Sequence, residues 1–266
     1  MVKYWRVGII AFMGTLEYRF DFLFDLLSKF FPALIQVFLW TAIYTNSTHR
    51  IIMGYSYQQM ILYTVMSIFI TGILAVNIHW KISEDIKNGY LSKYFVLPIE
   101  YFWYQFFQFL GTKVMEWLMI AVGMGGTLYL FWLKKYVEMD SQRLLIFIPV
   151  IVLAFALQYL LYYCMSAIAF WLGECGGVFI VLQVISLIVS GSIFPLDIFG
   201  EKVVWISGWL PFYYITYFPT NLFIGRVSNQ QIYNALVVML IWLVILKVFS
   251  RIIWEVGKKR YVAMGG

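Results

Sequence analysis

Long apolar stretches alternate with short polar segments along almost the whole chain. Six of them approach the length of about 20 residues that crosses the hydrocarbon core of a bilayer as a helix. They cover residues 26–45, 56–79, 103–132, 144–171, 178–194 and 232–254. The stretch 103–132 is longer than a bilayer requires, so its first turns are expected at a membrane interface. The pattern predicts an all-α integral membrane protein with six transmembrane helices, folded as a single transmembrane domain over 1–266.

The first 25 residues predict a helix that lies in the plane of the membrane. At 100° per residue, charged side chains gather on one face and large apolar side chains on the opposite face, which is typical of interfacial helices. Arg19 alone lies at the edge of the apolar face. The charged face consists of Lys3, Arg6, Glu17, Asp21 and Asp25, and the apolar face of Trp5, Ile9, Phe12, Leu16, Phe20 and Leu23. The alternative is a helix packed on protein.

The most polar internal segment is 80–100, between the spans at 26–79 and those at 101–194. Ser83 can cap a short helix there, and Glu84 and Asp85 suit its first turn because carboxylates interact favourably with a helix N-terminus. Asn88–Gly89 is expected to end this helix. A second short helical piece, 91–96, is expected to stop before Pro98. The alternative is an ordinary solvated loop.

The segment 195–231 is too apolar for a free loop and too interrupted for a span. Its prolines are Pro195, Pro211 and Pro219. Non-helical backbone at membrane depth must be buried in protein or line a cavity. We therefore expect a re-entrant helical hairpin that turns near Ser207–Gly208, before the last span and tail at 232–266. Five aromatic side chains are expected at interface depth: Trp205, Trp209, Tyr213, Tyr214 and Tyr217. The alternative is a membrane-surface helix without function.

The composition fits a bilayer protein better than a soluble one. The chain is 63% hydrophobic and 12% charged, with 24 Phe, 20 Tyr and 11 Trp, whereas a soluble domain is about a quarter charged. The net charge of +6 is spread along the chain without a basic stripe, so contact with anionic lipids is expected and nucleic-acid binding is not. Cys164 and Cys175 have no metal-ligand or redox spacing and are expected to be structural.

Lysine and arginine counts predict the orientation, because cytoplasmic segments are enriched in both. With both termini inside, nine of these residues lie in inner segments: Lys3, Arg6, Arg19, Lys81, Lys87, Lys93, Lys258, Lys259 and Arg260. Six lie in outer loops: Arg50, Lys134, Lys135, Arg143, Lys202 and Arg226. Four more, Lys29, Lys113, Lys247 and Arg251, lie in the cytoplasmic halves of spans. The expected location is the cell membrane, with six spans and cytoplasmic termini.

In three segments the chain resembles the permease subunits of the type-2 ABC exporter family, and the resemblance in layout covers its whole length. SEDIKNGYLSKYFVLPI (83–99) is similar to the family's cytoplasmic loop, with its acidic-Ile-x-x-Gly start. SGSIFPLDIF (190–199) and LPFYYITYFPTNLFIGR (210–226) look like the stretch between the family's last two spans. These motifs are loose, and their order and placement carry the resemblance.

The resemblance implies a transporter driven by a separate ATPase. Residues of the 80–100 segment would form a coupling helix that touches the ATPase: Ser83, Glu84, Asp85, Ile86, Lys87 and Gly89. Gly191 and Pro195 would mark the outer gate at the end of the fifth span, and Pro211 and Pro219 would belong to the re-entrant segment. A second permease subunit, identical or related, would complete the path. The sequence contains no GxxxxGK[ST] pattern, so ATP and Mg²⁺ would bind the partner ATPase and no cofactor would bind this chain.

Other functions are weaker interpretations of the same residues. Lys113 and Glu116 are one helical turn apart and are expected to pair, either as an interfacial ion pair or as part of a pathway. His79 is expected at an interface, and Glu174 and Cys175 in a solvated turn. No carboxylate pair, Ser/His set or metal cluster is evident, which disfavours a lipid-modifying enzyme. A channel or secondary transporter without an ATPase remains the main alternative.

Overall fold

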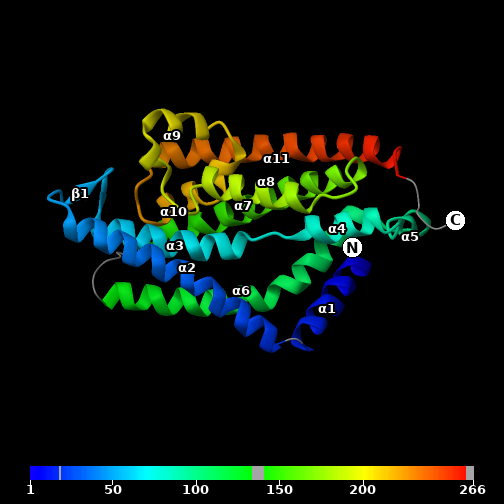
Figure 1. Cartoon of the computed structure of the whole chain (residues 1–266), viewed down its shortest axis with the longest axis horizontal. Helices are drawn as coiled ribbons and strands as arrows, with labels where there is room; N and C mark the ends of the chain where they lie inside the picture. Colours follow the sequence, from blue (N-terminus) through cyan, green and yellow to red (C-terminus); the bar gives the residue numbers. More distant parts are fainter. Residues whose placement is uncertain (18, 134–140, 262–266) are drawn as a thin grey trace.

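The computed structural model is built almost entirely of helices (Figure 1). It describes residues 1–17, 19–133 and 141–261, and the side chains of these residues except 17–30 and 141–142. The long helices are α2 (Arg19–Asn46), α3 (Tyr57–Leu74), α6 (Tyr101–Leu133), α7 (Ser141–Ser166) and α11 (Asn229–Lys258). The shorter ones are α1 (Val2–Glu17), α4 (Ile78–Lys87), α5 (Ser92–Val96), α8 (Gly176–Val189), α9 (Glu201–Ser207) and α10 (Tyr217–Phe223). The described residues also form the 3₁₀ turns η1 (Ala167–Phe170), η2 (Leu196–Phe199) and η3 (Pro211–Tyr214).

In the described part of the chain, four helical stretches are long and apolar enough to cross a membrane, so the all-α membrane class is confirmed. They are Tyr57–Lys87, Tyr101–Leu133, Arg143–Phe170 and Asn229–Lys258. The other two predicted spans correspond to α2 and to α8, a shorter apolar helix of 14 residues. The arrangement of six spans stays a prediction. Residues 134–140 of the predicted outer loop and residues 262–266 of the predicted tail lie outside the described part of the chain. The side chains of the predicted interfacial helix beyond Leu16 lie outside it too.

Helix α7 is the centre of the bundle. It packs against α3, α4, α10 and α11, and its residues Val150, Ala154 and Leu157 are completely buried. The apolar pattern continues through Pro149, which a membrane helix tolerates when its neighbours satisfy the freed backbone. This burial fixes one face of α4 and of α10, the two short helices at opposite ends of the bundle.

The N-terminus, α4, α5 and the end of α11 gather at one end of the molecule (Figure 1). The hydroxyl of Tyr4 accepts a hydrogen bond of 2.9 Å from the backbone N–H of Glu100, and the ammonium of Lys3 donates to the carbonyl of Pro98. The hydroxyl of Tyr261 accepts from the backbone N–H of Ser92 at 3.1 Å. The first residues of the chain and Tyr261 therefore lie beside the 80–100 segment.

Helix α1 packs along the first half of α6, which bends away from the long axis of the bundle (Figure 1). The two backbones approach closely, because a Cβ on Gly111 would lie 2.1 Å from the carbonyl oxygen of Gly8. Trp5, Ile10 and Met13 remain exposed on the far side of α1. The helix thus contacts protein and still presents an apolar face, so an interfacial location stays a prediction.

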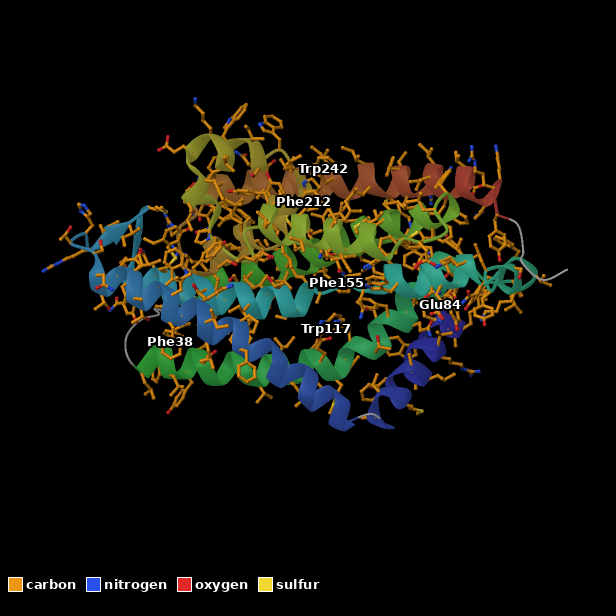
Figure 2. All side chains as sticks on the ribbon, in the orientation of Figure 1. Phe38, Glu84, Trp117, Phe155, Phe212 and Trp242 are labelled. Carbon is orange, nitrogen blue, oxygen red and sulfur yellow. The ribbon has the colours of Figure 1, made fainter. Side chains whose placement is uncertain are left out.

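The predicted second span, 56–79, is interrupted. Helix α3 ends at Leu74, and α4 begins at Ile78. The indole nitrogen of Trp117 donates a hydrogen bond of 2.8 Å to the carbonyl of Ile73, which the break leaves without its helical partner. Figure 2 places Trp117 between α6 and the middle of the bundle. The sequence contains no proline or glycine at the break, so the apolar pattern alone predicts a continuous helix there.

A small β-hairpin, which the sequence pattern did not predict, lies at the opposite end of the molecule. Strands β1 (Ile51–Ile52) and β2 (Tyr55–Ser56) pair antiparallel. Met53 and Gly54 turn with positive φ angles of 53° and 78°, the conformation of the tight turns that join such strands. Ser56 then caps α3 through a capping box with Gln59.

Candidate functional site

Helix α4 differs from the short helix predicted within 80–100. It begins five residues earlier than the predicted cap, with Asn77 in the N-cap position. Ser83 therefore lies inside the helix, where its hydroxyl donates to the carbonyl of Trp80 at 2.9 Å. The predicted end is correct, because Asn88 follows the last helical residue and Gly89 has a φ of 75°. The predicted second piece, 91–96, is present as α5 over Ser92–Val96.

Asp85 is buried between α4 and α6, with 1% of its surface exposed. Its carboxylate accepts hydrogen bonds from the hydroxyl of Tyr101 at 2.8 Å and from the amide of Gln105 at 3.0 Å. The ammonium of Lys81 lies 3.5 Å from the other carboxylate oxygen. A buried carboxylate requires such partners, because desolvation disfavours its charge. Asp85 thus joins α4 to the start of α6.

A second contact joins α4 to the turn between α7 and α8. The ammonium of Lys87 lies 2.6 Å from the carboxylate of Glu174. Glu174 is solvated as expected, but Cys175 is not, because only 2% of its surface is exposed and its thiol faces the carbonyl of Leu172 at 3.3 Å. Burial raises the pKa of the Cys175 thiol, and the charge of Lys87 offsets part of that rise.

The burial of α4 divides the six predicted coupling residues into two groups. Ser83, Asp85 and Ile86 are buried against this chain itself, and their part in coupling stays a prediction. Glu84 is exposed, at the end of the molecule where α4 lies (Figure 2), and Lys87 and Gly89 are half-buried. Helix α4 is amphipathic, and its apolar face packs on its own bundle. The residues on that face are therefore buried, and those on the opposite face are more exposed.

An exposed apolar surface at this end lies in α5 and just after it. Phe95 is 52% exposed, Val96 87% and Leu97 50%. Figure 1 shows α5 at the far end of the molecule, next to the last turns of α11. Tyr94, by contrast, is buried against Tyr101 and Tyr104, and burial raises the pKa of its phenol. We call Phe95, Val96 and Leu97 the α5 tip.

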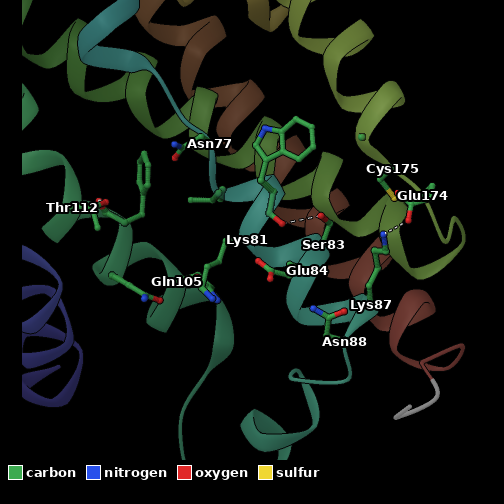
Figure 3. Close-up of a pocket in the computed structure, with 15 residues that line it drawn as sticks. Asn77, Lys81, Ser83, Glu84, Lys87, Asn88, Gln105, Thr112, Glu174 and Cys175 are labelled. Atoms are coloured by element: carbon green, nitrogen blue, oxygen red, sulfur yellow. Dashed lines mark hydrogen bonds and ion pairs between the residues drawn. The ribbon is translucent and has the colours of Figure 1, made fainter. Parts of the chain in front are cut away.

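A groove of about 730 Å³ runs along the exposed side of α4, which includes Glu84 and Asn88 (Figure 3). Its walls are one face of α4, the Gln105–Thr112 turns of α6, and residues 174–176 at the start of α8. Most of the lining side chains are polar. Polar side chains that face a groove of this size in an apolar bundle mark it as a candidate binding site.

The segment 195–231 contains two short helices with a turn between them. Helix α9 ends at Ser207, and α10 follows after η3, which begins at Pro211. Pro219 is the third residue of α10, where the first turn tolerates proline. Trp205 and Trp209 are exposed. Among the other three aromatic residues, Tyr214 and Tyr217 are buried and Tyr213 is half-buried. The place of all five at interface depth stays a prediction.

Gly191 and Pro195 lie directly after α8. Gly191 has a φ of 72°, and a Cβ there would lie 2.9 Å from that of Tyr217 and 3.0 Å from the hydroxyl of Tyr63. That hydroxyl donates to the carbonyl of Gly191 at 2.7 Å. Glycine is required at this close approach between α3, α8 and α10.

Asp197, in η2, joins α10 to the hairpin, a contact that the sequence pattern did not predict. It accepts hydrogen bonds from the hydroxyls of Tyr55 at 2.6 Å and Tyr217 at 2.8 Å. The guanidinium of Arg226 lies 3.5 Å from the centre of the Tyr55 ring. Tyr55 and Asp197 are 142 residues apart in the chain, so no local signal could have paired them.

The predicted ion pair within α6 is present. The ammonium of Lys113 donates to the carboxylate of Glu116, and both side chains are buried. His79 is also buried, packed between the rings of Trp80, Tyr162 and Phe179. Among the described residues, no cluster of His, Cys, Asp and Glu could hold a metal ion.

One comparison with known proteins identifies the family. The family model described as ABC-2 family transporter protein matches residues 30–265. A search of curated proteins and a search of solved structures each returned no match. The matched region includes α4, α5, both short helices after α8 and the last span. The chain is therefore a member of the ABC-2 family of transporter proteins.

Proposed function

We propose that this chain is the permease subunit of an ABC exporter in the cell membrane, and that a separate ATPase chain supplies the energy. The observation that supports this most is the exposed α5 tip, at the end of the molecule that holds both termini. Membership of the ABC-2 family implies ATPase partners in general. An apolar surface beyond the ends of the long helices faces water and not lipid, so it fits a protein partner.

The ATPase docks on the α5 tip and on the exposed side of α4, near Glu84 and Asn88. Asp85, Ser83 and Ile86 act behind this surface, because they hold α4 against the permease. A partner whose affinity differs between two permease conformations shifts the equilibrium between them. Movement of α4 reaches α6 through Asp85 and reaches α8 through the pair of Lys87 and Glu174.

In this proposal the chain crosses the membrane six times, with α2 and α8 as the two spans beyond the four long ones, and the termini, α4 and α5 lie in the cytoplasm. Helices α9 and α10 form the re-entrant segment, and Gly191 and Pro195 lie at the outer gate beside Asp197. A second permease subunit, a copy or a related chain, completes the path. ATP and Mg²⁺ bind the ATPase, so this chain is not itself catalytic.

Affinity purification from the native membrane in mild detergent tests this function. Co-purifying chains are identified by mass and assayed for ATP hydrolysis. We expect a chain with a P-loop in a fixed ratio to the permease. An intact preparation without an ATPase would contradict the proposal and would favour a secondary transporter or channel.

A further inference from the structure

A small basic pocket lies between the start of α6 and the second half of α11. Its volume is about 120 Å³, and its walls come from residues 100–102, from Tyr163 of α7 and from residues of α11 between Lys247 and Lys258. Pockets that enclose a whole small ligand typically measure about 300–1,000 Å³, so this one suits a small chemical group. It shares no lining residue with the groove along α4 or with the α5 tip.

Positive charge is in excess in this pocket. Its lining holds three cations and two carboxylates: Lys247, Arg251, Lys258, Glu100 and Glu255. The Lys258 ammonium is paired with the Glu255 carboxylate at 2.9 Å. Among the described residues, no carboxylate lies within 4.0 Å of Lys247 or of Arg251. Three positive charges against two negative ones leave a surplus of one, which equals the single negative charge of a phosphodiester.

The two unpaired cations lie on the same side of α11, because they are four residues apart on a helix. The ammonium of Lys247 lies 3.2 Å from the centre of the Phe102 ring and 5.5 Å from that of Trp103. Aromatic faces attract a cation but do not neutralise its charge. Lys247 is half-buried and Arg251 is exposed, so both are accessible to a ligand. Like charges one helical turn apart repel each other, and an anion between them would relieve that repulsion.

The surface beside the pocket is apolar and exposed. Helix α11 is among the described helices that are long and apolar enough to cross a membrane, and most of its apolar window is not buried. Val244 and Val248 lie on the same side of α11 as Lys247, and both are exposed. Acyl chains are as apolar as such side chains and can cover them. Charged residues in membrane helices direct their ends toward the head groups, so a lipid can contact the valines and the cations together.

We propose that this pocket binds the phosphate of an anionic membrane lipid, in the leaflet at the end of the molecule that holds α4 and α5. Arg251 offers a planar fork of N–H donors that matches two phosphate oxygens, and Lys247 adds a point charge. A free phosphate has the same charge chemistry but no acyl chain to cover Val244 and Val248. Binding of this lipid needs neither ATP nor an ATPase, so it goes beyond the proposed function and can fail independently of it.

Native mass spectrometry of the full, delipidated chain in detergent counts bound lipids directly. Phosphatidylglycerol and phosphatidylcholine with the same acyl chains are titrated at an ionic strength of about 0.15 M, where distant charges are largely screened. We expect one phosphatidylglycerol per chain to bind about tenfold more tightly than phosphatidylcholine. Glycerol phosphate at the same concentration should not displace it. Equal binding of the two lipids, or displacement by glycerol phosphate, would overturn the proposal.

Two charge-matched variants connect the lipid to the pocket. Lys247→Gln combined with Arg251→Gln should weaken phosphatidylglycerol binding about thirtyfold, because two basic contacts to the head group are lost. Lys259→Gln combined with Arg260→Gln is the control, since both residues are exposed at the end of the same helix and outside the pocket. The control should weaken binding no more than about threefold, because screening limits the reach of exposed charges.

Glu100→Gln tests the same charge balance in the opposite direction. Of the two carboxylates in the pocket, Glu100 is the one without an ion pair among the described residues. Its removal should tighten phosphatidylglycerol binding about threefold, a gain that misfolding would not produce. Wild-type affinity in the Lys247 and Arg251 variant, equal weakening by the control, or no gain from Glu100→Gln would overturn the proposal. Loss of a co-purifying ATPase from the Lys247 and Arg251 variant, without any lipid preference, would overturn it in favour of a protein partner on this face.

Discussion

The carboxylate of Asp85 lies 3.0 Å from the side-chain nitrogen of Gln105, although 20 residues and the whole of α5 separate them. The loop that connects α4 to α6 therefore has its two ends joined by this hydrogen bond. Whatever binds the α5 tip acts on a segment whose base is held by one buried carboxylate.

Replacing Asp85 tests this connection. Asp85→Ala leaves the Tyr101 hydroxyl and the Gln105 amide without their acceptor, at about 1–3 kcal/mol for each buried group. We expect a clear fall in the melting temperature of the permease in lipid discs. The matched control is Glu84→Ala, which removes the neighbouring exposed carboxylate and should change stability by no more than about 0.5 kcal/mol. Equal effects of the two substitutions would contradict the account.

The ion pair of Lys87 and Glu174 should contribute little to stability. The Glu174 side chain is 89% exposed, and exposed pairs are worth about 0–1 kcal/mol. Glu174→Gln should therefore lower the free energy of unfolding by no more than this small amount, and the melting temperature should change little. Lys87→Glu should slow transport by repulsion across the contact between α4 and α8, and the double charge reversal with Glu174→Lys should restore it. A transport defect that the reversal does not rescue would remove this pair from the coupling route.

The close contact between α1 and α6 predicts a strong effect at Gly111. A Cβ at this position would lie 2.1 Å from the backbone oxygen of Gly8, so Gly111→Ala must displace α1. We expect greater protease sensitivity of the N-terminal 17 residues. Gly125→Ala on the same helix has no atom within 4 Å of the added Cβ and should leave the digestion pattern unchanged. Identical patterns for the two variants would show that α1 does not pack here.

The Cys175 thiol should react slowly at ordinary pH. Its pKa is raised by burial, so the reactive thiolate forms only at a pH above the ordinary range of free cysteine, about 8.5. In a Cys164→Ser background, the rate of alkylation by N-ethylmaleimide should keep rising beyond that pH. Lys87→Met removes the nearby positive charge and should shift the profile further upward. A midpoint at or below the ordinary value would contradict the observed burial.

The sequence predicted those parts of the fold that depend on local pattern. Apolar length predicted the long helices, and Asn88–Gly89 predicted the end of α4, because both signals act within a few residues. The start of α4 was missed for the opposite reason. Its break at 75–77 is stabilised by Trp117, which lies 44 residues beyond Ile73.

The candidate site shows the same division. The 80–100 segment could be located from polarity, but the sequence could not show which of its charged residues is buried. Glu84 and Asp85 are adjacent carboxylates, and only the position of Tyr101 and Gln105 on α6 makes one of them a structural anchor. The pairing of Asp197 with Tyr55 likewise depends on the packing of distant helices.

The central claim is that the ATPase binds the α5 tip while Asp85 acts within the permease. The measurement is co-purification of the ATPase with three variants: Val96→Glu combined with Leu97→Glu, Asp85→Asn, and the control Ile51→Glu, an exposed apolar residue of the hairpin at the opposite end. We predict that the α5-tip variant loses the ATPase, whereas the other two retain it and Asp85→Asn alone of these two loses ATP-driven transport. Wild-type recovery of the ATPase with the α5-tip variant would contradict the claim.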